Sequence, residues 1–293
     1  MSEPAFDPTA PLTASGNLRR RRLVSRCAEY GATAAAVLAV GVLAIVIYTV
    51  VARGADALSF DFIFKAAPDG IAPELVGTGI IVGIATAIAM PIGVLIALYL
   101  TEYAGGRAAD AIRLTLDVMN GLPSIIIGLF IFGLIVKPQQ QQSGIAASIA
   151  LTIIEVPLIA RGSQEVLLLV PANLREAADA LGVSRWRAVL GIVLPSALGG
   201  IVTATVLSVA RAAGETAPLI FATAVFDPGR FSLDPFEALP NVPVRVYQLS
   251  EEANPAGFAE AWGLSFVLVS LILFASLGAR ALLARSKKRM ASS

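Results

Sequence analysis

Long runs of apolar residues dominate the chain and alternate with shorter polar segments. Six runs reach the length of about 20 residues that a helix needs to cross the roughly 30 Å hydrocarbon layer of a membrane. The pattern predicts membrane-spanning helices near residues 31–51, 75–100, 118–136, 144–161, 196–226 and 262–283. We therefore expect an all-α, polytopic membrane protein with a six-helix transmembrane domain over residues 31–285.

The composition narrows the class of protein further. Of the 293 residues, 56% are hydrophobic and only 15% are charged, whereas about 25% of the residues of a soluble domain are charged. A compact soluble fold of this size would have too little polar surface. The composition therefore excludes a soluble globular enzyme.

Several residue types that catalysis or cofactor binding would need are missing from the sequence. It has no histidine, which excludes Ser-His-Asp and Cys-His catalysis and any histidine metal site. Its one cysteine, Cys27, cannot form an intrachain disulfide, and no Gly-Lys dipeptide is present for a phosphate-binding P-loop. The net charge of +1 does not suggest a nucleic-acid partner. We expect no catalytic residue, no metal site and no cofactor bound by this chain, and another chain would hydrolyse any ATP involved.

Lys and Arg are distributed unevenly between the two sides of the membrane. If the N-terminus is placed in the cytoplasm, the cytoplasmic segments hold 15 of these residues and the external segments hold five. The positive-inside rule then predicts that both termini are cytoplasmic. This topology gives cytoplasmic tails at 1–30 and 286–293, a cytoplasmic loop at 171–195, and an external, proline-rich, turn-rich loop at 227–260.

The cytoplasmic loop predicts two short helices joined by a glycine. Asn173 is a candidate N-cap with Glu176 three residues later, and Gly182 can take the positive φ that ends a helix. A second helix is expected from about Ser184 into the fifth span, with Pro195 at the entry of that span. An amphipathic helix lying at the lipid interface would fit the same pattern.

The order of residues in this loop resembles the EAA loop of the permeases of bacterial ABC importers. The matching residues are Glu176, Ala177, Ala178, Gly182, Ile192, Leu194 and Pro195. The resemblance implies the type I ABC importer permease fold, in which this loop is a coupling helix that docks on an ATP-binding subunit. The predicted topology agrees, because it places the loop in the cytoplasm.

Two Arg–Glu pairs with the same four-residue spacing fall in or beside the predicted spans. A charged side chain at the bilayer centre costs at least about 2.5–3.5 kcal/mol, so such residues are functional candidates. Arg211 and Glu215 are expected on one helix face in the middle of the fifth span, and Arg161 and Glu165 at the cytoplasmic end of the fourth. Arg211 could offer five donors to an oxyanion while Glu215 holds or releases the arginine. The alternatives are mutual neutralisation for the first pair and an interfacial ion pair for the second.

The residues around Arg211 resemble the signature R-A-x-G-E-T-A-P-L of the PstA-type permeases of phosphate ABC importers. The signature is matched by Arg211, Gly214, Glu215, Thr216, Ala217 and Pro218. The stretches Gly121–Ser124 and Leu239–Tyr247 agree as well, and the resemblance extends from about residue 70 to 280. The Ala-Pro pair favours the PstA type over the PstC type, which is its partner permease.

This resemblance implies a permease subunit that moves inorganic phosphate across the plasma (cytoplasmic) membrane, with Arg211, Glu215, Arg161 and Glu165 along the substrate pathway. The partners it implies are a PstC-like second permease, two PstB-like subunits that bind ATP and Mg, an extracytoplasmic PstS-like phosphate-binding protein, and membrane lipid. A permease for another oxyanion, such as phosphonate, molybdate or sulfate, is the alternative, because the EAA loop fits it equally. An intramembrane enzyme would need a nucleophile–base pair or a metal cluster that the predicted spans lack.

Overall fold

The computed structural model describes residues 18–67, 69–103, 105–225, 230–252 and 254–291, and these residues form helices and no strand. In chain order the elements are α1 (Leu18–Gly54), the 3₁₀ turn η1 (Ala55–Ala57), α2 (Phe60–Phe64), α3 (Ala72–Leu98), the π-helical η2 (Tyr99–Tyr103), α4 (Gly106–Gly121), α5 (Ser124–Ile131), the π-helical η3 (Phe132–Val136), α6 (Lys137–Gln139), α7 (Gly144–Leu168), α8 (Ala172–Ala180), α9 (Arg185–Ala188), the π-helical η4 (Val189–Val193), α10 (Leu194–Ala212), α11 (Ala217–Thr223), α12 (Val242–Glu251) and α13 (Pro255–Ala291). Within these described ranges, five helical segments, or six if one bent pair counts as a single span, are long and apolar enough to cross a membrane. The predicted all-α, polytopic fold class is confirmed.

The chain divides into two units, Met1–Val51 and Ala52–Ser293. The described part of the first unit belongs to helix α1. Its large apolar side chains, such as Leu38, Leu43 and Ile45, are exposed. An exposed apolar helix of this length suits contact with lipid or with another apolar helix.

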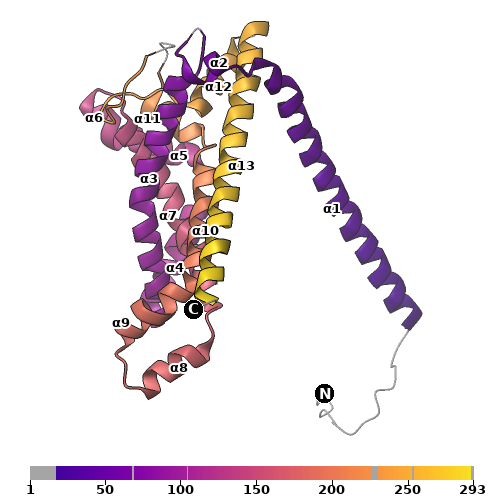
Figure 1. Cartoon of the computed structure of the whole chain (residues 1–293), viewed down its shortest axis with the longest axis vertical. Helices are drawn as coiled ribbons and strands as arrows, with labels where there is room; N and C mark the ends of the chain where they lie inside the picture. Colours follow the sequence, from indigo (N-terminus) through magenta and orange to yellow (C-terminus); the bar gives the residue numbers. More distant parts are fainter. Residues whose placement is uncertain (1–17, 68, 104, 226–229, 253, 292–293) are drawn as a thin grey trace, which may run out of the picture. The chain divides into compact units, whose positions relative to one another are not determined.

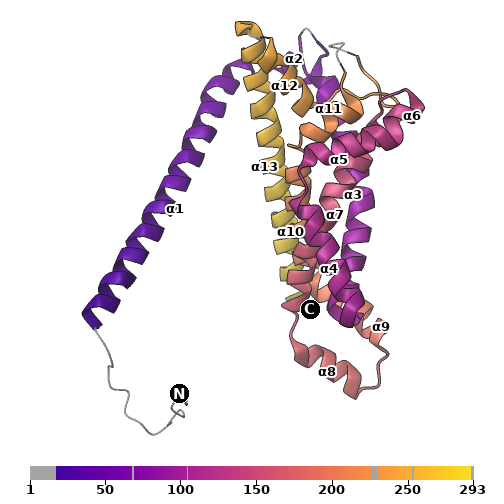
Figure 2. The same cartoon turned by 180° about the vertical axis from the view of Figure 1, so that it is seen from behind.

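The second unit is a bundle in which α3, α7, α10 and α13 run lengthwise beside one another (Figures 1 and 2). Helix α7 packs against both α3 and α10, and α10 also packs against α13. The short helices α8 and α9 lie at one end of this bundle, and α2, α6 and α12 lie at the opposite end. Parts of the two loops that the sequence places on opposite sides of the membrane therefore lie at opposite ends of the bundle.

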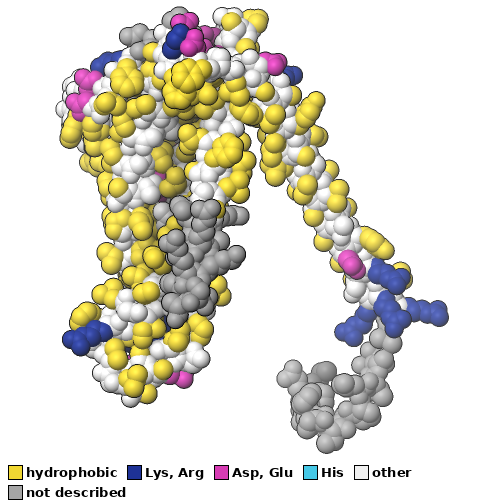
Figure 3. All heavy atoms as spheres, viewed as in Figure 1, with side chains coloured by type: hydrophobic (Ala, Val, Ile, Leu, Met, Phe, Trp, Pro, Cys, Tyr) yellow, Lys and Arg dark blue, Asp and Glu magenta, His cyan; other side chains and the backbone are white. Residues whose placement is uncertain are grey.

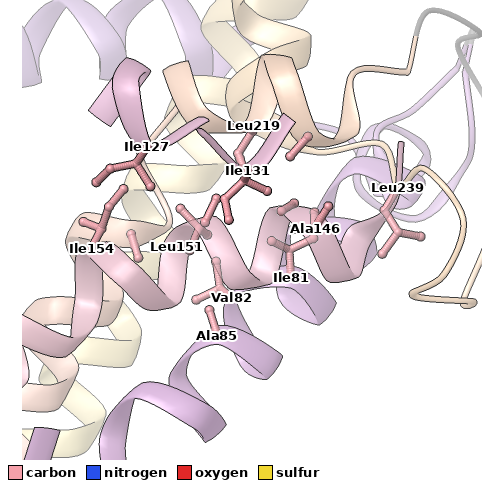
Figure 4. Close-up of a cluster of buried hydrophobic side chains, with 14 of the residues drawn as sticks. Ile81, Val82, Ala85, Ile127, Ile131, Ala146, Leu151, Ile154, Leu219 and Leu239 are labelled. Carbon is pink, nitrogen blue, oxygen red and sulfur yellow. The ribbon is translucent and has the colours of Figure 1, made fainter. Parts of the chain in front are cut away.

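The core of the second unit lies where α3, α5, α7 and α11 meet. Ile81, Ile131, Leu151 and Leu219 come from these four helices and are buried together in one cluster (Figure 4). The cluster fixes the short helices α5 and α11 against the lengthwise helices. It thereby positions two points at which the helical structure is broken, one before α5 and one before α11.

The first break interrupts the span predicted at 118–136. Helix α4 ends at Gly121, α5 begins at Ser124, and the segments Gly106–Gly121 and Ser124–Gln139 meet at an angle of 97°. Pro123 explains the break, because the residue before a proline avoids the helical conformation, and Leu122 has a ψ of 131°. The stretch predicted as a span at 118–136 is therefore bent and not one continuous helix.

The second break interrupts the span predicted at 196–226. Helix α10 ends at Ala212, and the short α11 begins at Ala217 with Pro218 in its first turn, where proline is favoured. The expectation that Arg211 and Glu215 share one helix face is therefore wrong. Glu215 lies in the link between the two helices.

The external segment predicted as a turn-rich loop at 227–260 contains helical structure. Asn241 caps α12, because its side chain accepts a hydrogen bond from the backbone N of Val244 at 3.1 Å. Pro243 occupies the first turn of α12, and α13 begins at Pro255, before the predicted residue 262. Prolines that suggested turns therefore mark helix starts instead.

Side chains of different character occupy different parts of the second unit. Apolar side chains cover much of its length, and charged side chains gather mainly toward its two ends (Figure 3). This distribution suits a bundle with its middle in lipid and its ends in water.

Candidate functional site

Arg211 and Glu215 lie on either side of the turn that separates α10 from α11. Arg211 is in the last turn of α10. The turn is closed by backbone hydrogen bonds from Gly214 N to Arg211 O (3.0 Å) and from Glu215 N to Ala212 O (3.1 Å). The turn and the start of α11 include the signature residues Gly214, Thr216, Ala217 and Pro218.

The side chains of Arg211 and Glu215 are close together but weakly paired. Arg211 Nε lies 3.6 Å from Glu215 Oε1, which is longer than a normal hydrogen bond of 2.7–3.2 Å. The Arg211 side chain is 60% exposed and the Glu215 side chain 17%. Within the described residues, the Arg211 guanidinium donates no hydrogen bond to the protein, so its five donors are available to a ligand.

Arg211 lines a cavity of about 410 Å³ between α7 and α10. Glu165, Thr203 and Ser208 line the same cavity. The Ser208 hydroxyl is buried and has no hydrogen-bond partner among the described residues. The cavity is otherwise mostly apolar, so its few polar groups mark where a polar ligand would be held.

Arg211 also lines a second cavity of about 200 Å³, which it shares with Glu215, Asn120 and Ser124. Ser124 is the first residue of α5 and follows the break at Pro123. The Gly-Leu-Pro-Ser stretch at 121–124 carries part of the family resemblance, but the sequence alone did not place Asn120 or Ser124 in the site. The signal that could have found them is Pro123, because the turn it forces brings the start of α5 to Arg211.

Close packing holds α5 against α11 beside this second cavity. A Cβ atom at Gly128 of α5 would lie 2.6 Å from the Cα of Pro218 in α11. A larger side chain at this position would push the two helices apart. Gly128 therefore allows the close contact between α5 and α11, which holds the two helix breaks next to each other.

Arg161 and Glu165 do not form the predicted pair. Arg161 forms an ion pair with Asp117 of α4 and donates from Nη2 to the carbonyl of Arg113 at 3.1 Å. Glu165 is exposed and lines the larger cavity with Arg211. The four-residue spacing predicted a local pair, but a partner on a neighbouring helix takes the guanidinium instead. The structure thus brings Glu165, and not Arg161, to the cavity of Arg211.

Glu155 is a buried carboxyl group inside the bundle, away from both cavities of Arg211. It lies in the middle of α7 and is fully buried. Thr86 of α3 donates its hydroxyl to the two carboxyl oxygens, at 3.0 and 3.3 Å. This contact links α3 to α7 inside the bundle.

The EAA residues lie on α8, at the end of the bundle (Figure 1). Glu176 and Ala177 are exposed, whereas Ala178 is buried against the protein. Gly182 has the predicted positive φ, 69°, in the turn after α8. Beside it, the Leu181 side chain is 82% exposed, so α8 and its turn present an uncovered surface with an apolar residue.

The second half of the EAA match lies where the π-helical η4 passes into α10. Leu194 begins α10 with Pro195 in its first turn, as predicted, and Ile192 and Leu194 are half-buried. The predicted N-cap is wrong, because Asn173 lies inside α8 and Pro171 occupies the N-cap position.

The sequence of this chain matches known transport proteins over most of its length. The family model described as "Binding-protein-dependent transport system inner membrane component" matches residues 89–292. The phosphate transport system permease protein PstA 1 of Mycobacterium tuberculosis (strain ATCC 25618 / H37Rv) is 35% identical over 95% of this chain and 94% of that protein. PstA of Haemophilus influenzae (strain ATCC 51907 / DSM 11121 / KW20 / Rd) is 41% identical over 69% of this chain and 73% of that protein.

Solved structures share the fold. A chain of a bacterial alginate ABC transporter, solved with a periplasmic protein that holds an alginate pentasaccharide, matches with a TM-score of 0.63 and 13% identity over 92% of this chain and 96% of that chain. A chain of the inward-facing MetNI methionine ABC transporter matches with a TM-score of 0.58 and 20% identity over 78% of this chain and 99% of that chain. The predicted ABC importer permease fold is confirmed. The chain belongs to the binding-protein-dependent transport system inner membrane component family, as a permease of the PstA type.

Proposed function

We propose that this chain is one half of the membrane channel of an ABC importer that moves inorganic phosphate into the cytoplasm. Its relatives are named as phosphate transport permeases, which favours phosphate over phosphonate, molybdate or sulfate. ATP hydrolysis drives the transport. It takes place on separate subunits, because this chain has no P-loop of its own. The chain itself then performs no chemical step.

The observation that carries the proposal is the weakly paired Arg211 between two cavities. A guanidinium matches the oxygen atoms of an oxyanion with several donors at once. A pathway site must also be weak enough to release its ion. Glu215 meets this need, because it neutralises Arg211 when the site is empty and repels the anion when the site is full.

The other polar groups around Arg211 fit an anion that changes its hydration step by step. Asn120 and Ser124 offer donors in the smaller cavity, and Ser208 offers a hydroxyl in the larger one. Glu165 in the larger cavity limits how long an anion stays there. Arg161 reaches the anion only if Asp117 releases it, so its role in the pathway is secondary.

The coupling helix α8 docks on an ATP-binding subunit through Glu176, Ala177 and the Gly182 turn. These residues are exposed or lie in the exposed turn at one end of the bundle, which the charge distribution assigns to the cytoplasm together with both termini. A PstC-like permease completes the channel, two PstB-like subunits bind ATP and Mg, and a PstS-like protein delivers phosphate at the opposite end.

The experiment that tests this function uses the complete importer in lipid vesicles. We expect uptake of radiolabelled phosphate that requires ATP and the phosphate-binding protein. A tenfold excess of unlabelled sulfate, molybdate or phosphonate should leave that uptake unchanged, whereas unlabelled phosphate should suppress it. Uptake that one of the other oxyanions suppresses equally well would contradict the assignment of the substrate.

A further inference from the structure

Arg175, the residue directly before Glu176, ties α8 to the bundle with all of its side-chain nitrogen atoms. Nη2 donates to Glu102 Oε1 at 2.8 Å, and Nε donates to Oε1 and Oε2 of the same carboxylate at 3.1 and 3.4 Å. Nη1 donates to the carbonyl of Val170 at 2.8 Å, and Nη2 donates to that of Leu167 at 3.0 Å. One guanidinium thus joins three segments of the chain.

These contacts satisfy groups that would otherwise be costly to bury. The Glu102 side chain is only 5% exposed, and a buried carboxylate needs a charged or hydrogen-bonding partner. Arg175 is its partner among the described residues. Leu167 lies in the last turn of α7, where the carbonyls lack partners within the helix, and Val170 follows directly after the C-cap residue of α7. Arg175 therefore also caps α7.

The joint lies where the lengthwise helices converge. Glu102 belongs to η2, which continues α3, and it lines a small cavity together with Val189 and Val193, which belong to a buried apolar cluster. This cluster joins α3, α7, η4 and α10 through Ala97, Leu98, Leu167, Val170, Val189, Val193, Ala197 and Ile201. Displacement of α8 would consequently act directly on the ends of α3 and α7, and through the cluster on α10, which carries Arg211.

Neighbouring residues of α8 lie on two different sides of the helix, one exposed and one in contact with the bundle. Glu176 and Ala177 are exposed, whereas Arg175 contacts the bundle and Ala178 is buried. A force applied to Glu176 on the exposed side therefore acts on the residue next to Arg175, which contacts Glu102. A single flexible contact would absorb such a force, but the fork of an arginine on a carboxylate fixes direction as well as distance.

We propose that Arg175 and Glu102 are positioning residues that form a rigid joint, which transmits the movement of α8 to α3 and α7 during transport. This inference rests on the proposed function, in which α8 docks on the ATP-binding subunit. Lysine cannot replace arginine here, because it offers one point charge and lacks the planar fork that reaches both the carboxylate and the carbonyls.

The first test compares the complete importer with its Arg175→Lys variant in vesicles. We expect the same amount of assembled complex and sustained ATP hydrolysis, but phosphate moved per ATP hydrolysed should fall at least about fivefold, the lower end of common coupling effects. The matched control is Arg113→Lys, because Arg113 pairs with Asp110 on the surface at 3.2 Å. The control should keep the wild-type ratio. An unchanged ratio in Arg175→Lys would overturn the joint, whereas absent transport by the wild type would instead overturn the proposed function.

The second test replaces the joint with a covalent one and does not depend on the stability of a single variant. The substitutions Glu102→Cys and Arg175→Cys are combined with Cys27→Ser, which removes the native thiol. Without a cross-linker, the ratio of phosphate to ATP should be low; a short bifunctional thiol reagent should restore it at least about fivefold. A ratio that stays low after cross-linking would overturn the proposal, because a fixed connection would then not be what transport requires. Loss of the remaining transport upon cross-linking would overturn it as well, because it would show that the two segments must move apart.

Discussion

Two Arg–Glu pairs of this permease use the same chemical groups in opposite ways. Arg211 lies 3.6 Å from Glu215, is 60% exposed and leaves its donors free among the described residues. Arg175 lies 2.8 Å from Glu102 and engages every side-chain nitrogen with protein acceptors. An arginine with unused donors beside a cavity can take a ligand, and an arginine with satisfied donors can only hold structure. The completeness of pairing, more than the presence of charge, thus distinguishes the pathway from the joint.

The largest effect on stability should come from breaking the satisfied pair. Arg175→Ala leaves a buried carboxylate without its partner, which typically costs about 3–5 kcal/mol. We expect a lower thermal unfolding midpoint of the detergent-solubilised complex than for the wild type. Arg211→Ala serves as the comparison and should change stability by less than about 1 kcal/mol, because the pair is long at 3.6 Å and the Arg211 side chain is 60% exposed. Equal destabilisation by the two substitutions would remove the distinction between them.

The largest effect on transport at constant stability should come from the unsatisfied arginine. Arg211→Ala removes the hydrogen bonds that the charged guanidinium would donate to phosphate, each worth about 1.5–3 kcal/mol. We therefore expect ATP-dependent phosphate uptake to fall about 10- to 100-fold, with unchanged amounts of assembled complex. The control is Arg230→Ala, since Arg230 pairs with Glu237 on the surface and should transport normally. Normal uptake by Arg211→Ala would rule out its place in the pathway.

A smaller effect should follow from strain in the turn after α8. Gly182 has a φ of 69°, and a side chain with a Cβ costs about 1–2 kcal/mol in this conformation. Gly182→Val should therefore reduce co-purification of the ATP-binding subunits and phosphate uptake together. Gly182→Asn is the matched variant, because asparagine adopts positive φ more readily than valine, and it should retain most of both. Loss of both measures to the same degree in the two variants would point to the size of the side chain and not to the backbone.

The smallest effect on stability and transport is expected from an ion pair that is exposed and lies beside neither of the two cavities. Asp61 and Lys65 have the same four-residue spacing as Arg211 and Glu215. Asp61 lies in α2 and Lys65 is its C-cap; both side chains are exposed, and Lys65 Nζ lies 2.7 Å from Asp61 Oδ2. Such pairs contribute about 0–1 kcal/mol. Asp61→Asn should leave the unfolding midpoint and phosphate uptake unchanged. A clear loss of uptake would mean that spacing alone marks functional pairs in this chain.

The sequence predicted the membrane class, the apolar runs and the EAA segment, because these depend on local composition and order. It did not predict the breaks at Pro123 and at Gly214, since a hydropathy window registers apolar content and not the direction of the chain. The proline and glycine themselves carry that signal. Reading them as helix boundaries would have separated Glu215 from the helix of Arg211.

The partners of charged residues were the part that the sequence could not supply. Arg161 bonds to Asp117, which lies 44 positions away, and Arg175 bonds to Glu102, which lies 73 positions away. A local rule for helical pairs favours Glu165 for Arg161, because it considers only residues three or four positions apart. Tertiary packing decides such contacts. The joint therefore became visible only in the folded chain.

Occupancy of the cavity beside Arg211 by phosphate can be measured directly. The substitution Asn120→Cys, combined with Cys27→Ser, places a thiol in the smaller cavity, and its labelling rate by a charged thiol reagent is followed in the complete importer during ATP-driven transport. Phosphate should slow the labelling, sulfate at the same concentration should not, and the addition of Arg211→Ala should abolish the protection. An importer that takes up phosphate while this thiol is labelled at the same rate with and without phosphate would contradict the proposed pathway.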